Sequence, residues 1–181
     1  TGKVEILSDG RFGQITIQNN HYQPLTHKDC FAAIHVETGH QTLTKKLVVN
    51  PETGIDQVHF YGSYPMPEVE YRDPDLPVQV RLRAFSPVYP QNLEDSSQPG
   101  IVFLYQVKNT GSQPATVSLA MVWANLIGKG GTPEQAFNPA SESIHTAFHR
   151  GNHAGVHYQY PYDAKTPLEK NAQGETILAC Q

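Results

Sequence analysis

Hydrophobic and polar residues alternate along much of this chain, most clearly in residues 78–85. Apolar residues occupy every second position there, and Gln79, Arg81 and Arg83 stand between them. A period of two is typical of a β-strand with one buried face and one face open to solvent or to a partner. The pattern therefore predicts a half-buried strand whose outward face carries two arginines.

Similar runs, separated by turn residues, predict further strands along the whole chain. They cover residues 3–7, 12–18, 31–37, 43–49, 57–61, 68–72, 101–109, 115–123, 143–148, 155–160 and 175–180. Asp9 and Gly10 predict a hairpin turn between the first two strands. The turn at 109–112 predicts that strands 101–109 and 115–123 are hairpin neighbours. A helical turn is conceivable only at 133–137.

Short strands without helical periodicity favour a β-sandwich. We predict an all-β fold, an antiparallel β-sandwich, in which residues 1–181 form a single domain. Strand 115–123 is apolar on both sides, so we expect both faces, and Trp123, to be buried. Residues 177–181 read as a strand cut by the chain end, so we expect an incomplete portion of a larger sandwich domain.

Composition argues against several classes of protein. The formal net charge of −4 disfavours nucleic acid and acidic membranes as partners. No apolar run could span a bilayer, and no signal peptide opens the chain, so we expect no transmembrane segment and a cytoplasmic location. Because the chain starts at Thr1, we expect a processed product or a fragment. Cys30 and Cys180 predict two buried free thiols rather than a disulfide.

The histidines invite a metal-site hypothesis, because His145, His149, His153 and His157 recur at every fourth position. On a helix they would share one face, but glycines interrupt the run and weaken a helix. On a strand, positions four apart lie about 13 Å apart, too far to share an ion. Scattered strand and loop histidines are the favoured interpretation.

Acidic pairs could supply the two carboxylates of a glycosidase. The candidates lie near polar turns, so solvated turn acids or Asx-type turn residues are the favoured interpretation; the pairs are Glu68 with Glu70, Asp73 with Asp75, and Glu94 with Asp95.

Arginine and tyrosine side chains leave two interpretations open. Arg81 and Arg83 either lie on a solvated surface or form ion pairs with Asp95 or with another domain. Several tyrosines lie beside prolines and either pack under turns or contact a sugar or another domain; they are Tyr61, Tyr64, Tyr89, Tyr158, Tyr160 and Tyr162.

A family resemblance rests on the segment that contains the predicted strand 78–85 and the loop after it. Residues 76–111 read LPVQVRLRAFSPVYPQNLEDSSQPGIVFLYQVKNTG, and residues 117–128 read VSLAMVWANLIG. This arrangement resembles the N-terminal domain of the non-lysosomal glucosylceramidases, the bile-acid β-glucosidase group (glycoside hydrolase family 116). The opening GKVEILSDGRFGQITIQNN is also similar to the start of that domain.

The resemblance implies a parent enzyme that hydrolyses β-glucosides or glucosylceramide-like substrates with retention of configuration. It implies no cofactor beyond water, and a C-terminal helical barrel that carries the catalytic carboxylates. This chain would then have no catalytic residue and would pack on the barrel, shaping the active-site rim. The expected contact is the loop 89–97, and the candidate substrate-rim or domain-interface residues are Arg83, Tyr89, Glu94, Asp95 and Ser96.

Two alternatives belong to other classes. A free-standing carbohydrate-binding β-sandwich module would present exposed aromatic rings on one sheet face and bind soluble glycans. A structural or adhesive β-domain would be expected in a secretory context, for which this chain carries no sign.

Overall fold

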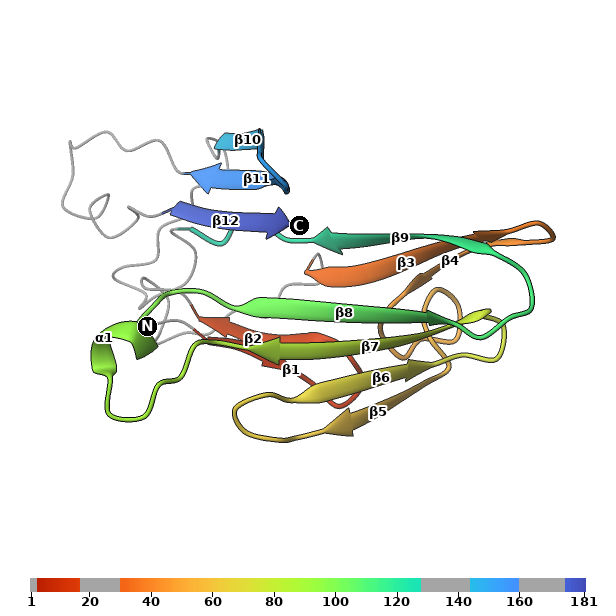
Figure 1. Ribbon diagram of the computed structural model, residues 1–181, viewed down its shortest axis with the longest axis horizontal. Coiled ribbons are helices and arrows are strands. Elements are labelled where there is room, and N and C mark those ends of the chain that lie inside the picture. Colours follow the sequence, from red (N-terminus) through yellow and green to blue (C-terminus); the bar gives the residue numbers. More distant parts are fainter. Residues whose placement is uncertain (1–2, 17–29, 128–143, 160–174) are drawn as a thin grey trace. The chain divides into compact units, whose positions relative to one another are not determined.

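The computed structural model describes residues 3–16, 30–127, 144–159 and 175–181, and these are almost entirely β (Figure 1). The predicted all-β fold is confirmed. No helix in these ranges has the length and hydrophobicity needed to cross a bilayer. The described strands are β1 (Lys3–Ile6), β2 (Phe12–Thr16), β3 (Phe31–Thr38), β4 (Thr42–Lys46), β5 (Gln57–Tyr61), β6 (Glu68–Arg72), β7 (Val78–Phe85), β8 (Val102–Asn109), β9 (Ala115–Val122), β10 (Ile144–Arg150), β11 (His153–Gln159) and β12 (Glu175–Cys180).

The chain divides into two compact units. The first, which we call the sandwich unit, comprises Glu5–Gly13 and Cys30–Val122. The second, the C-terminal unit, comprises Thr1–Val4, Gln14–Asp29 and Trp123–Gln181.

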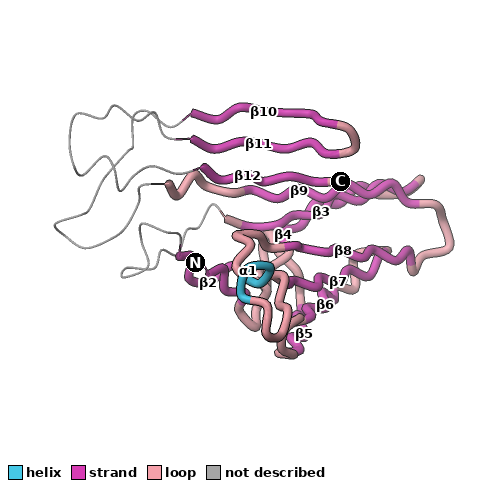
Figure 2. The backbone as a smooth tube through the Cα atoms, turned by 60° about the vertical axis from the view of Figure 1, so that its left-hand side comes forward, coloured by secondary structure: helices cyan, strands magenta, loops and turns pink. Residues whose placement is uncertain are grey.

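Two antiparallel sheets build the sandwich unit (Figure 2). One has the strand order β4-β3-β9 and the other the order β5-β6-β7-β8. Alternate apolar side chains of both sheets meet in one core cluster, because successive side chains of a strand point to opposite faces. The buried members are Ala32, Ile34, Val36, Leu47, Ile55, Val69, Tyr71, Leu76, Val78, Val80 and Leu82.

Strand β7 shows directly how the sequence pattern becomes a sandwich. Val78, Val80 and Leu82 are buried, whereas Arg83 between the apolar positions is exposed. Burial of such side chains stabilises the fold by about 1.5–3 kcal/mol each relative to exposure. The predicted bounds of β5, β6 and β7 agree with the structure.

Strands β8 and β9 correct one prediction. The turn between them does not close a hairpin, since β8 pairs with β7 and β9 pairs with β3 in the other sheet. The Thr110 hydroxyl and backbone N–H both donate to the Pro77 carbonyl, at 3.1 and 3.0 Å, and hold the turn against the start of β7. The connection therefore crosses from one layer of the sandwich to the other.

Strand β9 is also less buried than predicted. Leu119 is 42% and Val122 39% exposed, because β9 is an edge strand of its sheet. Trp123 follows the end of β9 and is half-buried rather than a core residue.

In the C-terminal unit, β10, β11 and β12 form a three-stranded antiparallel sheet. The buried Tyr158 donates its hydroxyl to the Trp123 carbonyl at 3.0 Å, and Asn125 donates to the Gln159 carbonyl at 3.2 Å.

Both cysteines are free thiols; Cys30 is buried, but Cys180 on the edge strand β12 is exposed, contrary to the prediction. The possible helical turn at 133–137, Tyr160 and Tyr162 lie outside the described residues.

Candidate functional site

The loop between β7 and β8 contains a one-turn helix, α1 (Leu93–Ser96), that the sequence pattern did not predict. Asn92 caps it: its side-chain oxygen accepts the Asp95 backbone N–H at 3.0 Å, and its amide donates to the Asp95 carboxylate at 2.7 Å. Such caps satisfy backbone donors that lack a helical partner. Four residues are too few for a helical period, so the sequence pattern predicts only a polar loop here.

Ser96 fastens the helix to the incoming chain. Its Oγ accepts the Tyr89 backbone N–H at 2.9 Å and donates to the Tyr89 carbonyl at 3.0 Å. Ser97 Oγ donates to the Leu93 carbonyl at 2.6 Å. The polar side chains of Asn92, Ser96 and Ser97 thus hold the loop through turn and cap hydrogen bonds.

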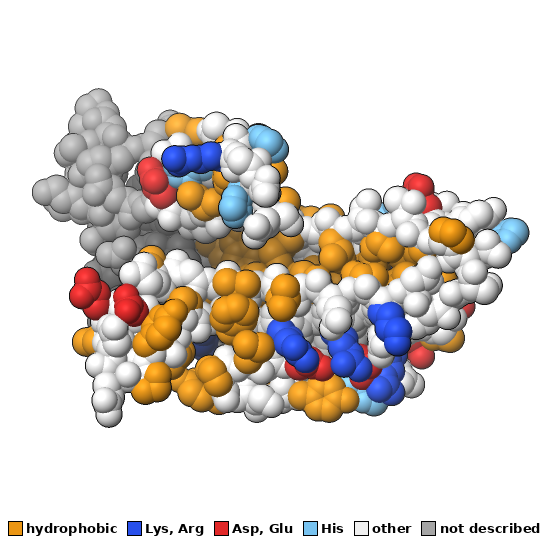
Figure 3. All heavy atoms as spheres, in the orientation of Figure 1, with side chains coloured by type: hydrophobic (Ala, Val, Ile, Leu, Met, Phe, Trp, Pro, Cys, Tyr) orange, Lys and Arg blue, Asp and Glu red, His pale blue; other side chains and the backbone are white. Residues whose placement is uncertain are grey.

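This ordered loop displays apolar side chains to solvent. Leu93 is 82% exposed and Tyr89 is 55% exposed. The loop between β5 and β6 lies at the same end of the sheet. The strand register shows this, because Glu68 at the start of β6 is opposite both Tyr61 at the end of β5 and Arg83 near the end of β7. Tyr64 in this loop is 86% exposed. We call the exposed apolar residues of these two loops and of the start of β8 the apolar end surface; they are Tyr64, Met66, Val88, Tyr89, Leu93, Ile101 and Val102. Figure 3 shows hydrophobic side chains gathered at the α1 end of the β5–β8 sheet.

The structure brings together only part of the predicted site. Tyr89, Asp95 and Ser96 share the α1 loop, and Glu94 is exposed on the same helix turn. Arg83 lies on the outward face of β7 and pairs with Glu68 at 2.7 Å, so the ion pair with Asp95, one of the two interpretations left open for this arginine, is not formed. Asp95 is instead tied to Asn92.

Charged side chains of β6 and β7 form a cross-strand ladder on the outward sheet face. Glu70, only 2% exposed, accepts from Arg72 at 2.7 Å, from Arg81 at 3.3 Å and from the Gln79 amide. Glu68 lies 3.8 Å from Arg81 as well as binding Arg83. Opposite charges directly across a strand pair stabilise a sheet. The sequence signal for this ladder is that two glutamates alternate along β6 and two arginines alternate along β7.

A second, partly buried ion pair links β4 of one sheet to the turn that follows β6 of the other. Lys45 of β4 donates to the Asp73 carboxylate at 2.6 Å, and the side chain of Asp73 is 1% exposed. The backbone N–H groups of Asp75 and Asp56 also donate to Asp73, at 2.9 and 3.2 Å. Glu70 lies within β6, is enclosed and has cationic partners, so its interpretation as a solvated turn acid is wrong. Asp73 is an Asx-type turn residue, because its carboxylate accepts the Asp75 N–H, but its side chain is enclosed rather than solvated.

These ion pairs lower carboxyl pKa values. Burial by itself raises the pKa of Glu70, but hydrogen bonds and charges of Arg72 and Arg81 outweigh it and hold the pKa below its ordinary value. Burial likewise raises the pKa of Asp73, and hydrogen bonds from Lys45, Asp75 and Asp56 bring it below its ordinary value.

Acid is expected to destabilise the sandwich unit. A carboxyl whose pKa is lower in the folded state contributes stability above its unfolded-state pKa and loses it as the pH falls through the folded-state pKa. We therefore expect the free energy of unfolding to hold from pH 7 to about pH 5 and to fall below about pH 4. Urea unfolding at pH 7, 5, 4 and 3 measures this, and Glu70→Gln should show a smaller acid loss. A stability that is unchanged or rises between pH 5 and 3 would contradict the assignment.

The four spaced histidines lie on two strands of the C-terminal unit. His145 and His149 belong to β10, whereas His153 and His157 belong to β11. His145 packs edge-on against Tyr158 with 5.2 Å between ring centroids, and His157 lies 3.1 Å from Glu175. Within the described ranges, no group of three or more His, Cys, Asp or Glu side chains is placed to hold a metal ion.

Comparison with known families accounts for the whole chain. The family model described as beta-glucosidase 2, glycosyl-hydrolase family 116 N-term, matches residues 1–181. The chain belongs to this family. The resemblance read from the segment around the α1 loop is thereby confirmed.

As a family 116 N-terminal domain, the chain is part of a β-glucosidase whose catalytic domain lies elsewhere in the protein. Glu68, Glu70 and Asp73 are engaged with arginine or lysine, and Asp95 is engaged in the α1 cap.

Proposed function

We propose that this domain is non-catalytic and packs, through the apolar end surface, on the catalytic domain of a retaining β-glucosidase. There it would help to shape the rim of the active site for β-glucosides or glucosylceramide-like substrates. The observation that carries the proposal is an ordered loop with an exposed apolar residue at its centre, Leu93 at 82% exposure. Exposed apolar patches of this kind mark interaction sites on soluble proteins.

Hydrogen bonds hold the α1 loop in one conformation before it meets a partner. Ordering a flexible loop on binding costs conformational entropy, whereas a loop that is already fixed loses little on association. The Ser96 and Asn92 hydrogen bonds fix the α1 loop, so Tyr89 and Leu93 are presented in one arrangement. A packed interface would cover both side chains and remove their apolar area from water.

The test compares Leu93→Asp with Val49→Asp in the parent enzyme, the second variant placing the same charge at another exposed apolar residue. A charge at the centre of the interface should lower kcat/KM for an aryl β-glucoside by roughly tenfold, or lower the melting temperature of the enzyme. Asp95→Ala should act in the same direction more weakly, because it loosens the cap. If Leu93→Asp matches the wild type in both measurements, the loop is not at the interface.

A further inference from the structure

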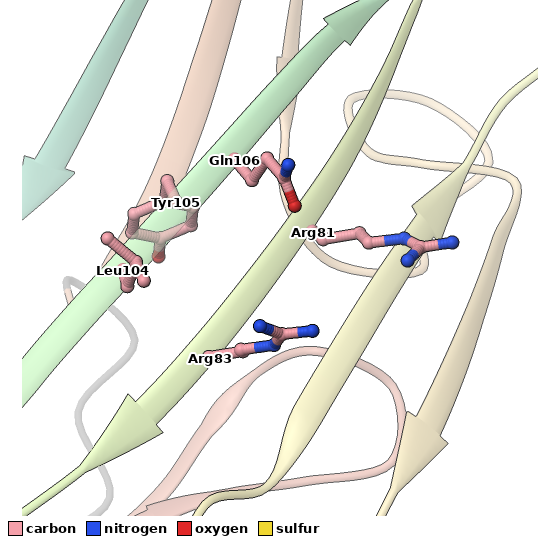
Figure 4. Close-up of a pocket in the computed structure, with 5 residues that line it drawn as sticks. All are labelled: Arg81, Arg83, Leu104, Tyr105 and Gln106. Carbon is pink, nitrogen blue, oxygen red and sulfur yellow. The ribbon is translucent and has the colours of Figure 1, made fainter.

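The outward face of the β5–β8 sheet carries a trough that the apolar end surface does not include. Strand register places Arg83 beside Leu104 and Arg81 beside Gln106 across the β7–β8 pair. Between them lies an open depression of about 340 Å³, lined by Arg81, Arg83, Leu104, Tyr105 and Gln106. Figure 4 shows Arg81 and Arg83 extending from β7 toward β6, and the Gln106 amide turned from β8 toward β7. The trough therefore runs over β7.

The polar groups of the trough are positioned before any ligand arrives. Glu68 holds Arg83 at 2.7 Å, and Arg81 lies 3.3 Å from Glu70 and 3.8 Å from Glu68. Arginine loses considerable side-chain entropy when it is immobilised, so prior fixation lowers the cost of binding. Guanidinium and amide groups are planar and present several donors at fixed spacing.

Charge and polarity in the trough favour a neutral, hydroxyl-rich ligand. Both arginines of the trough already have carboxylate partners, Glu70, which also binds Arg72, and Glu68, so an incoming carboxylate would compete with these glutamates. Leu104, at 54% exposure, offers an apolar wall for C–H groups, and Gln106 offers both a donor and an acceptor. A few placed polar groups beside apolar surface are the usual make-up of a small-molecule site.

The size of the trough limits the ligand. Pockets that bind small molecules enclose about 300–1,000 Å³, and this one is at the lower end of that range and open to solvent. We propose that the trough is a second, non-catalytic binding site for a neutral β-linked gluco-oligosaccharide. The choice of sugar rests on the proposed function, because the parent enzyme acts on β-glucosides; the location rests on the trough alone.

The experiment uses the parent enzyme with its active site blocked covalently by a 2-deoxy-2-fluoro-glucoside. Calorimetric titration with cellotriose should show binding with a Kd of about 1 mM. Gln106→Ala and, independently, Leu104→Ala should weaken it at least about tenfold, a loss of about 1.4 kcal/mol. Lys108→Ala is the matched control, since Lys108 is the next outward residue of β8 and lies outside the trough. Thermal melting of each variant checks that it is folded.

Each outcome decides the proposal. Loss of binding in the two trough variants with retention in Lys108→Ala supports it. It is overturned by no binding at about 10 mM cellotriose, by equal binding in all variants, or by tighter binding of glucuronate than of cellotriose. Hydrolysis of an aryl β-glucoside by the unblocked enzyme separately tests the substrate class on which the choice of sugar rests. Failure of the proposed function and failure of the trough proposal are therefore distinguishable.

Discussion

Replacing Asp73 with alanine is expected to lower the free energy of unfolding by about 3 kcal/mol. The side chain of Asp73 is 1% exposed and accepts hydrogen bonds from Lys45 at 2.6 Å and from the Asp75 and Asp56 backbones. Removing Asp73 leaves the largely enclosed Lys45 ammonium with only the more distant, exposed Asp75 carboxylate at 3.6 Å as an anionic partner. The variant also frees two backbone donors, and the tie between β4 and the β6–β7 turn is lost.

Asp75→Ala is the matched control for this prediction. Asp75 lies 3.6 Å from the same Lys45 ammonium, but its side chain is 73% exposed. An exposed pair contributes about 0–1 kcal/mol, so this variant should unfold close to the wild type. Urea unfolding at pH 7 measures both variants. Equal losses at the two positions would mean that burial does not set the strength of this pair.

Gly10→Ala is expected to destabilise the sandwich unit by about 2–3 kcal/mol. Gly10 adopts φ +86°, a left-handed conformation that disfavours every residue with a Cβ. A Cβ at this position would also lie 2.9 Å from the Leu47 carbonyl oxygen and 2.9 Å from the Tyr71 ring. The turn is held in place by the Val49 N–H, which donates to the Asp9 carbonyl at 2.9 Å, so the backbone cannot easily retreat.

Gly39→Ala tests whether the effect of Gly10→Ala is specific. A Cβ at Gly39 meets no atom within 4 Å, and its φ is not in the left-handed region. Alanine there should be neutral or should stabilise by up to about 1 kcal/mol, because it reduces the freedom of the unfolded chain. Differential scanning calorimetry of both variants gives the comparison. A melting temperature for Gly10→Ala as high as that of Gly39→Ala would exclude the proposed clash.

Residue-level patterns along the chain were sufficient for most of the β-structure. The alternation in 78–85 predicted β7 and the face that it buries, since one side-chain direction per residue is a local property of a strand. The Asp9–Gly10 turn followed from glycine's access to positive φ. Family membership was also readable from local motifs, because the 76–111 segment combines a strand, prolines and a polar loop in a specific order.

The site was predictable only in outline. The loop 89–97 was recognised, but α1 was not, because a four-residue helix held by Asn92 and Ser96 leaves no periodic signal. The partners of the acidic residues were missed for another reason. Arg81 meets Glu70 from a neighbouring strand, and Lys45 meets Asp73 across 28 residues of sequence.

Local sequence therefore determined which segments of this protein are strands, which side of each strand is apolar, and to which family the chain belongs. Tertiary structure alone decided that β8 and β9 enter different sheets, that Glu70 and Asp73 are enclosed, that Leu93 is exposed, and that Arg81 and Gln106 line one trough. The physical reason is that strand formation and the alternating direction of side chains along a strand depend on neighbouring residues. Strand pairing and register depend on residues far away in the chain, and those pairings set burial, ion pairs and surface shape.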